Sequence, residues 1–427
     1  MKFSIDVADT EVAQLLLDLV KINGIETWQR RFEWLQRELT DNPFMEHWLR
    51  ERCSLEWTMN GILADPSLKV GHPFRVTTLA QYELIGFAAG IVRCYDHLSE
   101  RAQKRLRGIL SDGLKEDKGL LSIQHEITTA VHLMSRGFDV EFRDLESGGG
   151  FDFLAKREDV ELEVECKMFS ADIGRKIHHR RAATFFKALA TVVSETYSSA
   201  TTGLIIDVTI PDRLTPASAQ HLAIEQTVRT ALISGEAITR NEHCAVKVRD
   251  FSIGSSPFGK HPANIPREEI DQFVANCTGR LNHHLMILFS PGKRAVILSV
   301  ASEKKDEVLH AMHRQLREAA KGQFTKTRPA ILAIQLHDLT ADQLADLALS
   351  DSSTREQATG LQIMTSDFLQ SPSRAHIHSV VFRSHGKLEV NPQAGTKQAS
   401  GLTYVIKNGY HPLHDDLHYS VFGIRSY

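Results

Sequence analysis

The sequence has few cysteines, no long apolar run and almost no net charge. Its five cysteines are scattered and form no C-x-x-C pair, so a disulfide scaffold is excluded and reduced thiols in a cytoplasmic protein are expected. The longest apolar run, 84–92, is far shorter than the ~20 residues that span a bilayer. Acidic residues at positions 6, 9 and 11 interrupt the amino-terminal segment, which is therefore unlike a secretory signal.

A formal charge of −3 excludes binding to a polyanion through net charge alone, although it leaves room for a local basic patch. The G-x-x-x-x-G-K-[ST] loop of ATP-driven motors is missing, and so is the G-x-S-x-G turn of serine hydrolases. The chain shows neither internal repeats nor low-complexity tracts. Without these motifs, the chemistry of the chain has to be sought in the charged residues of individual strands.

What the sequence does contain is typical of a globular α/β protein. It has 427 residues, 42% of them hydrophobic, which is enough for two or three domains with their own cores. We predict an all-helical region at 1–112, an α/β core at 113–238 and a mixed α/β domain at 239–427. The last domain carries no recognisable chemistry, and substrate recognition, oligomerisation and sensing of a partner protein all remain open for it.

Within the predicted core, apolar periodicity and turn residues define an order of elements. A helix is followed by three strands, and then by a helix, a strand and a helix. The expected ranges are 122–136, 138–142, 151–155, 160–167, 180–196, 203–210 and 216–234.

The strand at 160–167 has the most informative pattern. Side chains alternate across a strand, so Glu161, Glu163, Glu165 and Lys167 share one face. The apolar residues between them, with Cys166, share the other face and are expected in the core. A solvated strand face would explain such a pattern without any chemistry.

Asp152 makes a functional explanation more attractive. It lies between two phenylalanines directly after three glycines, and an acidic residue in an apolar strand costs free energy unless it is paired or binds a metal. In a hairpin of these two strands, Asp152 and Glu165 approach each other. A divalent cation relieves their repulsion, and oxygen ligands favour Mg²⁺ or Mn²⁺ over zinc.

These residues resemble the signature of the PD-(D/E)XK nuclease superfamily, which has the restriction-endonuclease-like fold. Asp152 matches its first acidic residue, Glu165 and Lys167 match its (D/E)-x-K pair, and Glu126 matches a glutamate on the preceding helix. Phe151 stands where the signature has proline. The predicted order of helix, three strands, helix and strand also resembles the family core.

The resemblance implies an Mg²⁺- or Mn²⁺-dependent endonuclease, a hydrolase that cleaves phosphodiester bonds. Asp152, Glu165, Glu126 and the backbone carbonyl of Cys166 would hold the metal. Lys167 would position or activate water, or offset developing charge. DNA is the implied substrate, and bacterial antiviral defence or restriction is the implied role, with a second copy or a defence-system protein as partner. The alternative is a non-catalytic nucleic-acid-binding or scaffold protein that retains the fold.

Two carboxylates have competing explanations. Glu126 is expected in the first turn of a helix capped by Ser122, where the helix dipole favours any glutamate. Glu163 is expected on the same face as Glu165, either as a further metal ligand or as a solvated or salt-bridged group.

A basic stretch follows the predicted metal site. We predict that Arg175, Lys176, Arg180 and Arg181 contact nucleic-acid phosphates, because a site that cleaves a polyanion needs cations beside it. The alternative is a solvated entrance to the helix at 180–196.

Overall fold

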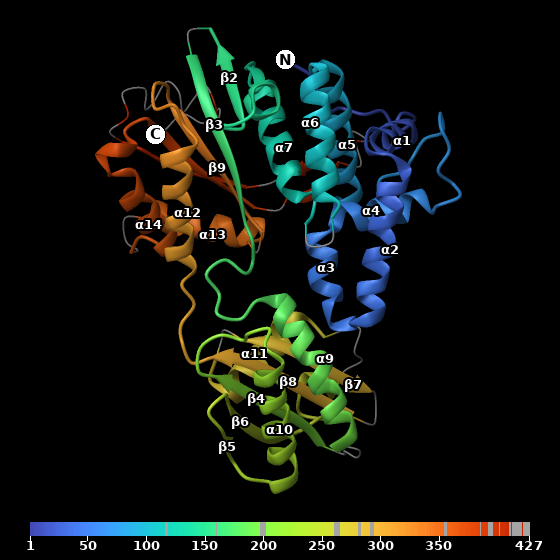
Figure 1. The fold of residues 1–427 in the computed structure, drawn as a ribbon, viewed down its shortest axis with the longest axis vertical. Helices are drawn as coiled ribbons and strands as arrows, with labels where there is room; N and C mark the ends of the chain where they lie inside the picture. Colours follow the sequence, from blue (N-terminus) through green and yellow to red (C-terminus); the bar gives the residue numbers. More distant parts are fainter. Residues whose placement is uncertain are drawn as a thin grey trace. The chain divides into compact units, whose positions relative to one another are not determined.

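The computed structural model describes most of the 427 residues. Its described residues are 1–115, 118–158, 160–196, 202–259, 265–280, 283–290, 294–337, 339–353, 357–384, 386–391, 396–400, 402–409, 411 and 421. The chain divides into two compact units (Figure 1). Unit 1 consists of Met1–Gln36, Leu49–Ile173 and Leu309–Tyr427, and unit 2 of Arg37–Trp48 and Gly174–Val308.

The first 113 residues are helical, as predicted, and contain no strand. Local capping helps to set the ends: Thr78 and Gln81 form a reciprocal capping box, and the hydroxyl of Ser99 accepts the N–H of Ala102. The helices are α1 (Val12–Asn23), α2 (Ile25–Asp41), α3 (Glu46–Arg52), α4 (Ser54–Leu63), α5 (Leu79–His97) and α6 (Glu100–Gly113), with a 3₁₀ turn at Pro43–Met45.

Unit 1 is built on a six-stranded mixed sheet in the order β1-β2-β3-β9-β10-β13. The first three strands are antiparallel, β9 runs parallel to both β3 and β10, and β13 is antiparallel to β10. Its elements after α6 are α7 (Leu121–Ser135), β1 (Asp139–Phe142), α8 (Arg143–Ser147), β2 (Phe153–Arg157), β3 (Val160–Phe169), α12 (Val308–Gly322), β9 (Ala330–Leu336), α13 (Ala341–Ser352), α14 (Gly360–Leu369), the 3₁₀ turn Pro372–Arg374, β10 (Ile377–Arg383), β11 (Lys387–Asn391), β12 (Thr396–Ser400) and β13 (Thr403–Lys407).

Both faces of this sheet are covered. Leu162, Val164 and Cys166 belong to one large core cluster with α7 and the amino-terminal helices, which confirms that Cys166 is a core residue. On the other face, Leu332 and Ile334 of β9 are fully buried beside Glu165 and Lys167 of β3. The charged face of β3 is therefore partly enclosed, and it is not a simple solvated surface.

Unit 2 has its own five-stranded mixed sheet, in the order β5-β6-β4-β8-β7. Leu204, Ile206 and Val208 of β4 pack in one cluster with α9 and α10, whereas Ile205 packs on the other face with residues of α11. The elements are α9 (His179–Thr196), β4 (Thr202–Ile210), α10 (Ser218–Ser234), β5 (Thr239–Arg240), β6 (Ala245–Ser252), the 3₁₀ turn Pro257–Gly259, α11 (Arg267–Thr278), β7 (His284–Ser290) and β8 (Arg294–Ser302).

The α/β class is thus confirmed, but the division of the chain differs from the predicted one at 1–112, 113–238 and 239–427. The strand beside β3 is β9, and not the strand expected at 203–210, which lies in the second sheet as β4. Unit 2 interrupts unit 1 between β3 and α12. The two apolar strands have similar local patterns, so the pattern alone does not assign either one to a sheet.

Among the described helices, none combines the length and apolar character needed to cross a membrane.

Candidate metal centre

A turn of three glycines positions Asp152. Gly148, Gly149 and Gly150 have φ values of 77°, 121° and 88°, a region that residues with a side chain rarely adopt. This turn leads from α8 into β2, where Phe153 pairs with Val164 of β3. The antiparallel register therefore brings Asp152 level with Glu165, as the predicted hairpin requires.

Hydrogen bonds and charge hold this pair of carboxylates in place. The backbone N–H of Cys166 donates to Oδ2 of Asp152 over 2.6 Å. Nζ of Lys167 forms an ion pair with Oε1 of Glu165, whose side chain is only 2% exposed. The predicted role of the Cys166 carbonyl as a metal ligand remains a prediction.

Three carboxylates from separate elements meet at this place. One oxygen each from Glu126 of α7, Asp144 of α8 and Asp152 before β2 lie within 4.8 Å of one another, and among the described residues they form the one group able to hold a metal ion. Each of the three is partly exposed. The site is therefore reachable by an ion while the protein excludes much of the surrounding water.

The raised pKa values of the three carboxyl groups indicate that their ionised forms are unfavourable here without a cation. Burial, reinforced by the charge of Glu165, raises the pKa of Asp152 to about 8. Burial also raises the pKa of Asp144 to about 6. For Glu126, burial and then the charges of Asp152 and Asp144 raise the pKa well above its usual value. Each of these carboxyl groups therefore holds its proton more tightly than an exposed carboxyl group does, unless positive charge is supplied.

The donor set fits a hard divalent cation. All candidate ligands are carboxylate oxygens, which Mg²⁺ and Mn²⁺ favour. Among the described residues, Oε2 of Glu165 and Oδ1 of Asp144 are buried and have no hydrogen-bond partner, although buried polar atoms are nearly always paired. A cation would satisfy such oxygens and offset the mutual repulsion.

Asp144 is the residue that sequence reasoning missed. It lies on α8, a single short turn of helix that follows β1 directly. The available signal was an acidic residue between a predicted strand and the glycine run. That signal was weak, because no periodic pattern indicates that the segment folds back toward Asp152.

Glu126 reaches the site from a different part of its helix than predicted. The helix begins at Leu121 with Leu120 at its amino-terminal cap, so Ser122 lies inside the helix and Glu126 lies beyond its first turn. The capping prediction was wrong because the preceding leucines also bury their side chains and extend the helix backward. Attraction to the helix end therefore does not explain this glutamate.

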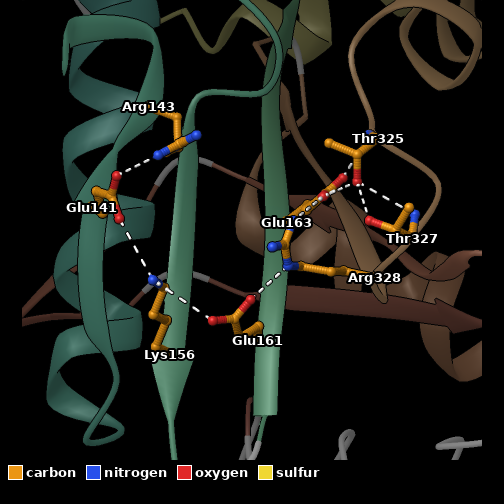
Figure 2. Close-up of polar contacts among 8 residues, drawn as sticks. All are labelled: Glu141, Arg143, Lys156, Glu161, Glu163, Thr325, Thr327 and Arg328. Carbon is orange, nitrogen blue, oxygen red and sulfur yellow. Dashed lines mark hydrogen bonds and ion pairs between the residues drawn. The ribbon is translucent and has the colours of Figure 1, made fainter. Parts of the chain in front are cut away.

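Glu163 is bound by protein groups (Figure 2). The N–H of Thr325 donates to its Oε2 over 2.9 Å, the Thr325 hydroxyl bonds its Oε1, and Nη1 of Arg328 lies 3.4 Å from the same oxygen. Arg328 also binds Glu161 over 2.5 Å. Of the two explanations for Glu163, the structure supports the salt-bridged one.

The predicted phosphate-binding residues all belong to unit 2. Lys176 is 7% exposed, and its Nζ lies 3.3 Å from Glu307, so it is not placed to contact a phosphate. Nη1 of Arg181 donates to the carbonyl of Leu214 over 3.2 Å. The side chain of Arg180 is 45% exposed and 3.9 Å from Glu38. Arg175 precedes them in the same segment, and contact between it and nucleic acid stays a prediction.

Comparison of the chain with protein-family models, curated proteins and solved structures finds no match. The site is interpreted from its own geometry and chemistry.

Proposed function

We propose that this chain is a divalent-cation-dependent nuclease that hydrolyses phosphodiester bonds. The observation that carries the proposal is the convergence of Glu126, Asp144 and Asp152 from three elements, next to the Glu165–Lys167 pair. Clustered carboxylates beside a lysine are suited to hold a cation against a phosphate, whose negative charge would otherwise be repelled.

The order of elements in unit 1 supports the same proposal. If unit 2 and the short helix α8 between β1 and β2 are treated as insertions, α7, β1, β2, β3, α12 and β9 follow one another as helix, three strands, helix and strand. This is the order of the PD-(D/E)XK core. The last two elements are then 308–322 and 330–336 instead of the segments expected from the sequence.

Each residue of the site has a distinct task in the proposal. Glu126, Asp144 and Asp152 would hold the cation, with Glu165 as a further ligand, and the N–H of Cys166 keeps the Asp152 carboxylate oriented. A bound Mg²⁺ would supply Lewis acidity and lower the pKa of a coordinated water. The carboxylates themselves bind, orient and exclude bulk water.

Lys167 acts as a fixed positive charge in this scheme. Burial alone would lower its pKa, but the neighbouring charge of Glu165 and the hydrogen bond to it raise the pKa above its usual value. Lys167 therefore stays protonated at neutral pH and donates a hydrogen bond. Its task is to orient a water or to stabilise charge that develops on the phosphate, and not to remove a proton.

DNA is the proposed substrate, and defence against foreign DNA is the proposed role. The experiment incubates the purified chain with plasmid, single-stranded DNA and RNA, each in Mg²⁺, Mn²⁺ or EDTA. Cleavage in either metal and none in EDTA is expected. Asp152→Asn and Lys167→Met should lower the rate by about 10²-fold or more.

Glu161→Gln is the matched control, because Glu161 lies on the same strand face and is 40% exposed in its pair with Arg328. It should cleave at the wild-type rate. A wild-type chain that binds nucleic acid yet cleaves none of the three substrates would contradict the nuclease proposal and favour the non-catalytic alternative.

A further inference from the structure

A pocket of unit 1 lies on the α7 face of the sheet, away from the charged face of β3. Its floor includes Met168, Gln335 and Arg383, which are neighbours across β3, β9 and β10. Tyr82 and Glu83 of α5 also line it. The pocket therefore lies at the carboxyl end of three parallel strands, a common place for ligands in α/β proteins.

Arg383 brings a positive charge to this pocket. Its Nη1 donates to the hydroxyl of Thr129 over 3.2 Å, and among the described residues no carboxylate forms an ion pair with it. Burial lowers the pKa of its guanidinium. The side chain of Arg383 is half-buried, so its charge has lost part of its hydration and one neutral acceptor replaces only part of that loss.

Arg31 shows how this protein otherwise accommodates a buried arginine. Its side chain is fully buried, and Nη2 lies 3.1 Å from Oε1 of Glu56. Nη1 donates to the carbonyl of Lys115, and Nη2 donates to that of Lys118. That guanidinium has a carboxylate and several acceptors. Arg383 is only half-buried and has one neutral acceptor among the described residues, so its other donors are available to a ligand in the pocket.

We propose that this pocket binds a small molecule with an oxyanion group, phosphate or carboxylate, which the guanidinium of Arg383 holds. The planar fork of arginine donors suits both oxyanions. Tyr82 and Ile5 line the same pocket and offer apolar surface to the uncharged part of such a molecule. The proposal does not depend on the nuclease proposal, since none of the carboxylates of the metal centre lines this pocket.

Other groups of the pocket are compatible with an anion. Burial and the charge of Arg383 lower the pKa of His132, whose Nε2 lies 3.1 Å from the carbonyl of Val421. The imidazole is therefore neutral and adds no repulsion. Burial raises the pKa of Glu83 to about 7, so this carboxyl is largely uncharged below that pH.

The test measures binding of inorganic phosphate, acetate and adenosine 5′-monophosphate to the full chain in EDTA at pH 6.5, by calorimetry and by thermal unfolding. At least one should bind and stabilise the wild type. Phosphate without acetate assigns a phosphate site, and acetate without phosphate assigns a carboxylate site. Arg383→Met should weaken binding by about 30-fold or more.

Two further measurements make the result decisive. Without ligand, Arg383→Met should raise Tm by about 2 °C or more, because an uncompensated charge is removed. Arg328→Met is the matched control: it loses the ion pairs of an exposed arginine and should keep the anion affinity of the wild type. Arg383→Lys is the second variant, and weaker binding is expected because lysine lacks the planar fork.

The proposal is overturned if none of the three anions binds the wild type, or if the folded Arg383 variant binds them with unchanged affinity. A fall in Tm of ligand-free Arg383→Met would also overturn it, since that result would make the guanidinium a stabilising group of the empty pocket.

Discussion

The backbone N–H of Cys166 donates a 2.6 Å hydrogen bond to Oδ2 of Asp152. This bond joins β3 to the turn before β2, so the carboxylate is held by the strand that carries Glu165 and Lys167. A hydrogen bond of this kind lowers the pKa of Asp152, yet burial and the charge of Glu165 outweigh it and raise the pKa to about 8. The fold thus orients a carboxylate whose ionisation it does not by itself support.

Asp144→Asn should weaken cation binding without weakening the fold. The amide keeps the oxygen that accepts backbone N–H groups but removes one charge from the group of Glu126, Asp144 and Asp152. The affinity for Mn²⁺, measured by calorimetry, should fall at least about tenfold, because affinity follows the number of charged ligands. In EDTA the Tm should not fall.

The control for this variant is Glu141→Gln, on the adjacent β1. Glu141 is 38% exposed, pairs with Arg143 at 2.6 Å and is not one of the three clustered carboxylates. It should leave Mn²⁺ affinity unchanged. Equal affinity in Asp144→Asn and the wild type would remove Asp144 from the site.

Glu163 and Glu165 lie two positions apart on β3 and should respond oppositely to the same substitution. Glu163→Gln weakens the contacts of a buried side chain with Thr325 and Arg328, so the free energy of unfolding should fall by about 1–3 kcal/mol. Glu165→Gln removes repulsion with Asp152 but also the ion pair with Lys167, so Tm in EDTA should change little while cation affinity is lost.

Chemical denaturation and Mn²⁺ calorimetry on both variants check this separation. Loss of cation affinity in Glu163→Gln at full stability would show that Glu163 is a ligand and that its contacts with Thr325 and Arg328 are secondary.

Local patterns predicted much of unit 1, and long-range packing explains what they missed. The alternation in 160–167 correctly separated the apolar face of β3 from its charged face, because a strand has a period of two whatever its partners. The partner itself was not predictable: 203–210 and 330–336 are both short apolar runs, and only the folded chain shows that the second lies beside β3.

Side-chain partners were equally hidden. Lys176 was predicted to contact phosphate because it lies in a basic stretch, but Glu307, distant in sequence, pairs with it. Asp144 was overlooked because α8 is too short to have a periodic signature. In both cases the decisive contact depends on tertiary structure that local sequence does not encode.

Arg180 and Lys176 test which part of the basic stretch contacts nucleic acid. Arg180 is exposed, so Arg180→Ala should reduce the slope of log K against log salt by about 0.9 if it contacts one phosphate of duplex DNA. Lys176→Met should leave the slope unchanged, because the lysine is buried and its Nζ pairs with Glu307.

Salt titrations of DNA binding in Ca²⁺ give both slopes. An unchanged slope for Arg180→Ala would exclude this residue from the contact surface. A reduced slope for Lys176→Met would mean that the lysine leaves its ion pair when DNA binds.

Glu83 should make stability depend on pH. Burial raises its pKa from 4.5 to about 7 in the folded chain, so the folded state binds the proton more tightly than the unfolded state does. Below pH 4.5 the carboxyl group is neutral in both states, and this component of stability is fully present. As pH rises toward 7, the unfolded chain ionises first, and stability falls by at most about 3 kcal/mol. Above pH 7 both states are ionised and the loss is complete. Glu83→Gln cannot ionise and should lack this component.

The measurement is the free energy of unfolding of the wild type and Glu83→Gln between pH 4.5 and 8, in EDTA and without added anions. Taking the difference between the two proteins cancels the titration of every group that they share. The variant should gain stability relative to the wild type as pH rises, and the gain should level off above pH 7. A difference that is constant across this range would show that Glu83 titrates at its ordinary pKa, and that the wall of the Arg383 pocket is open to water at that position.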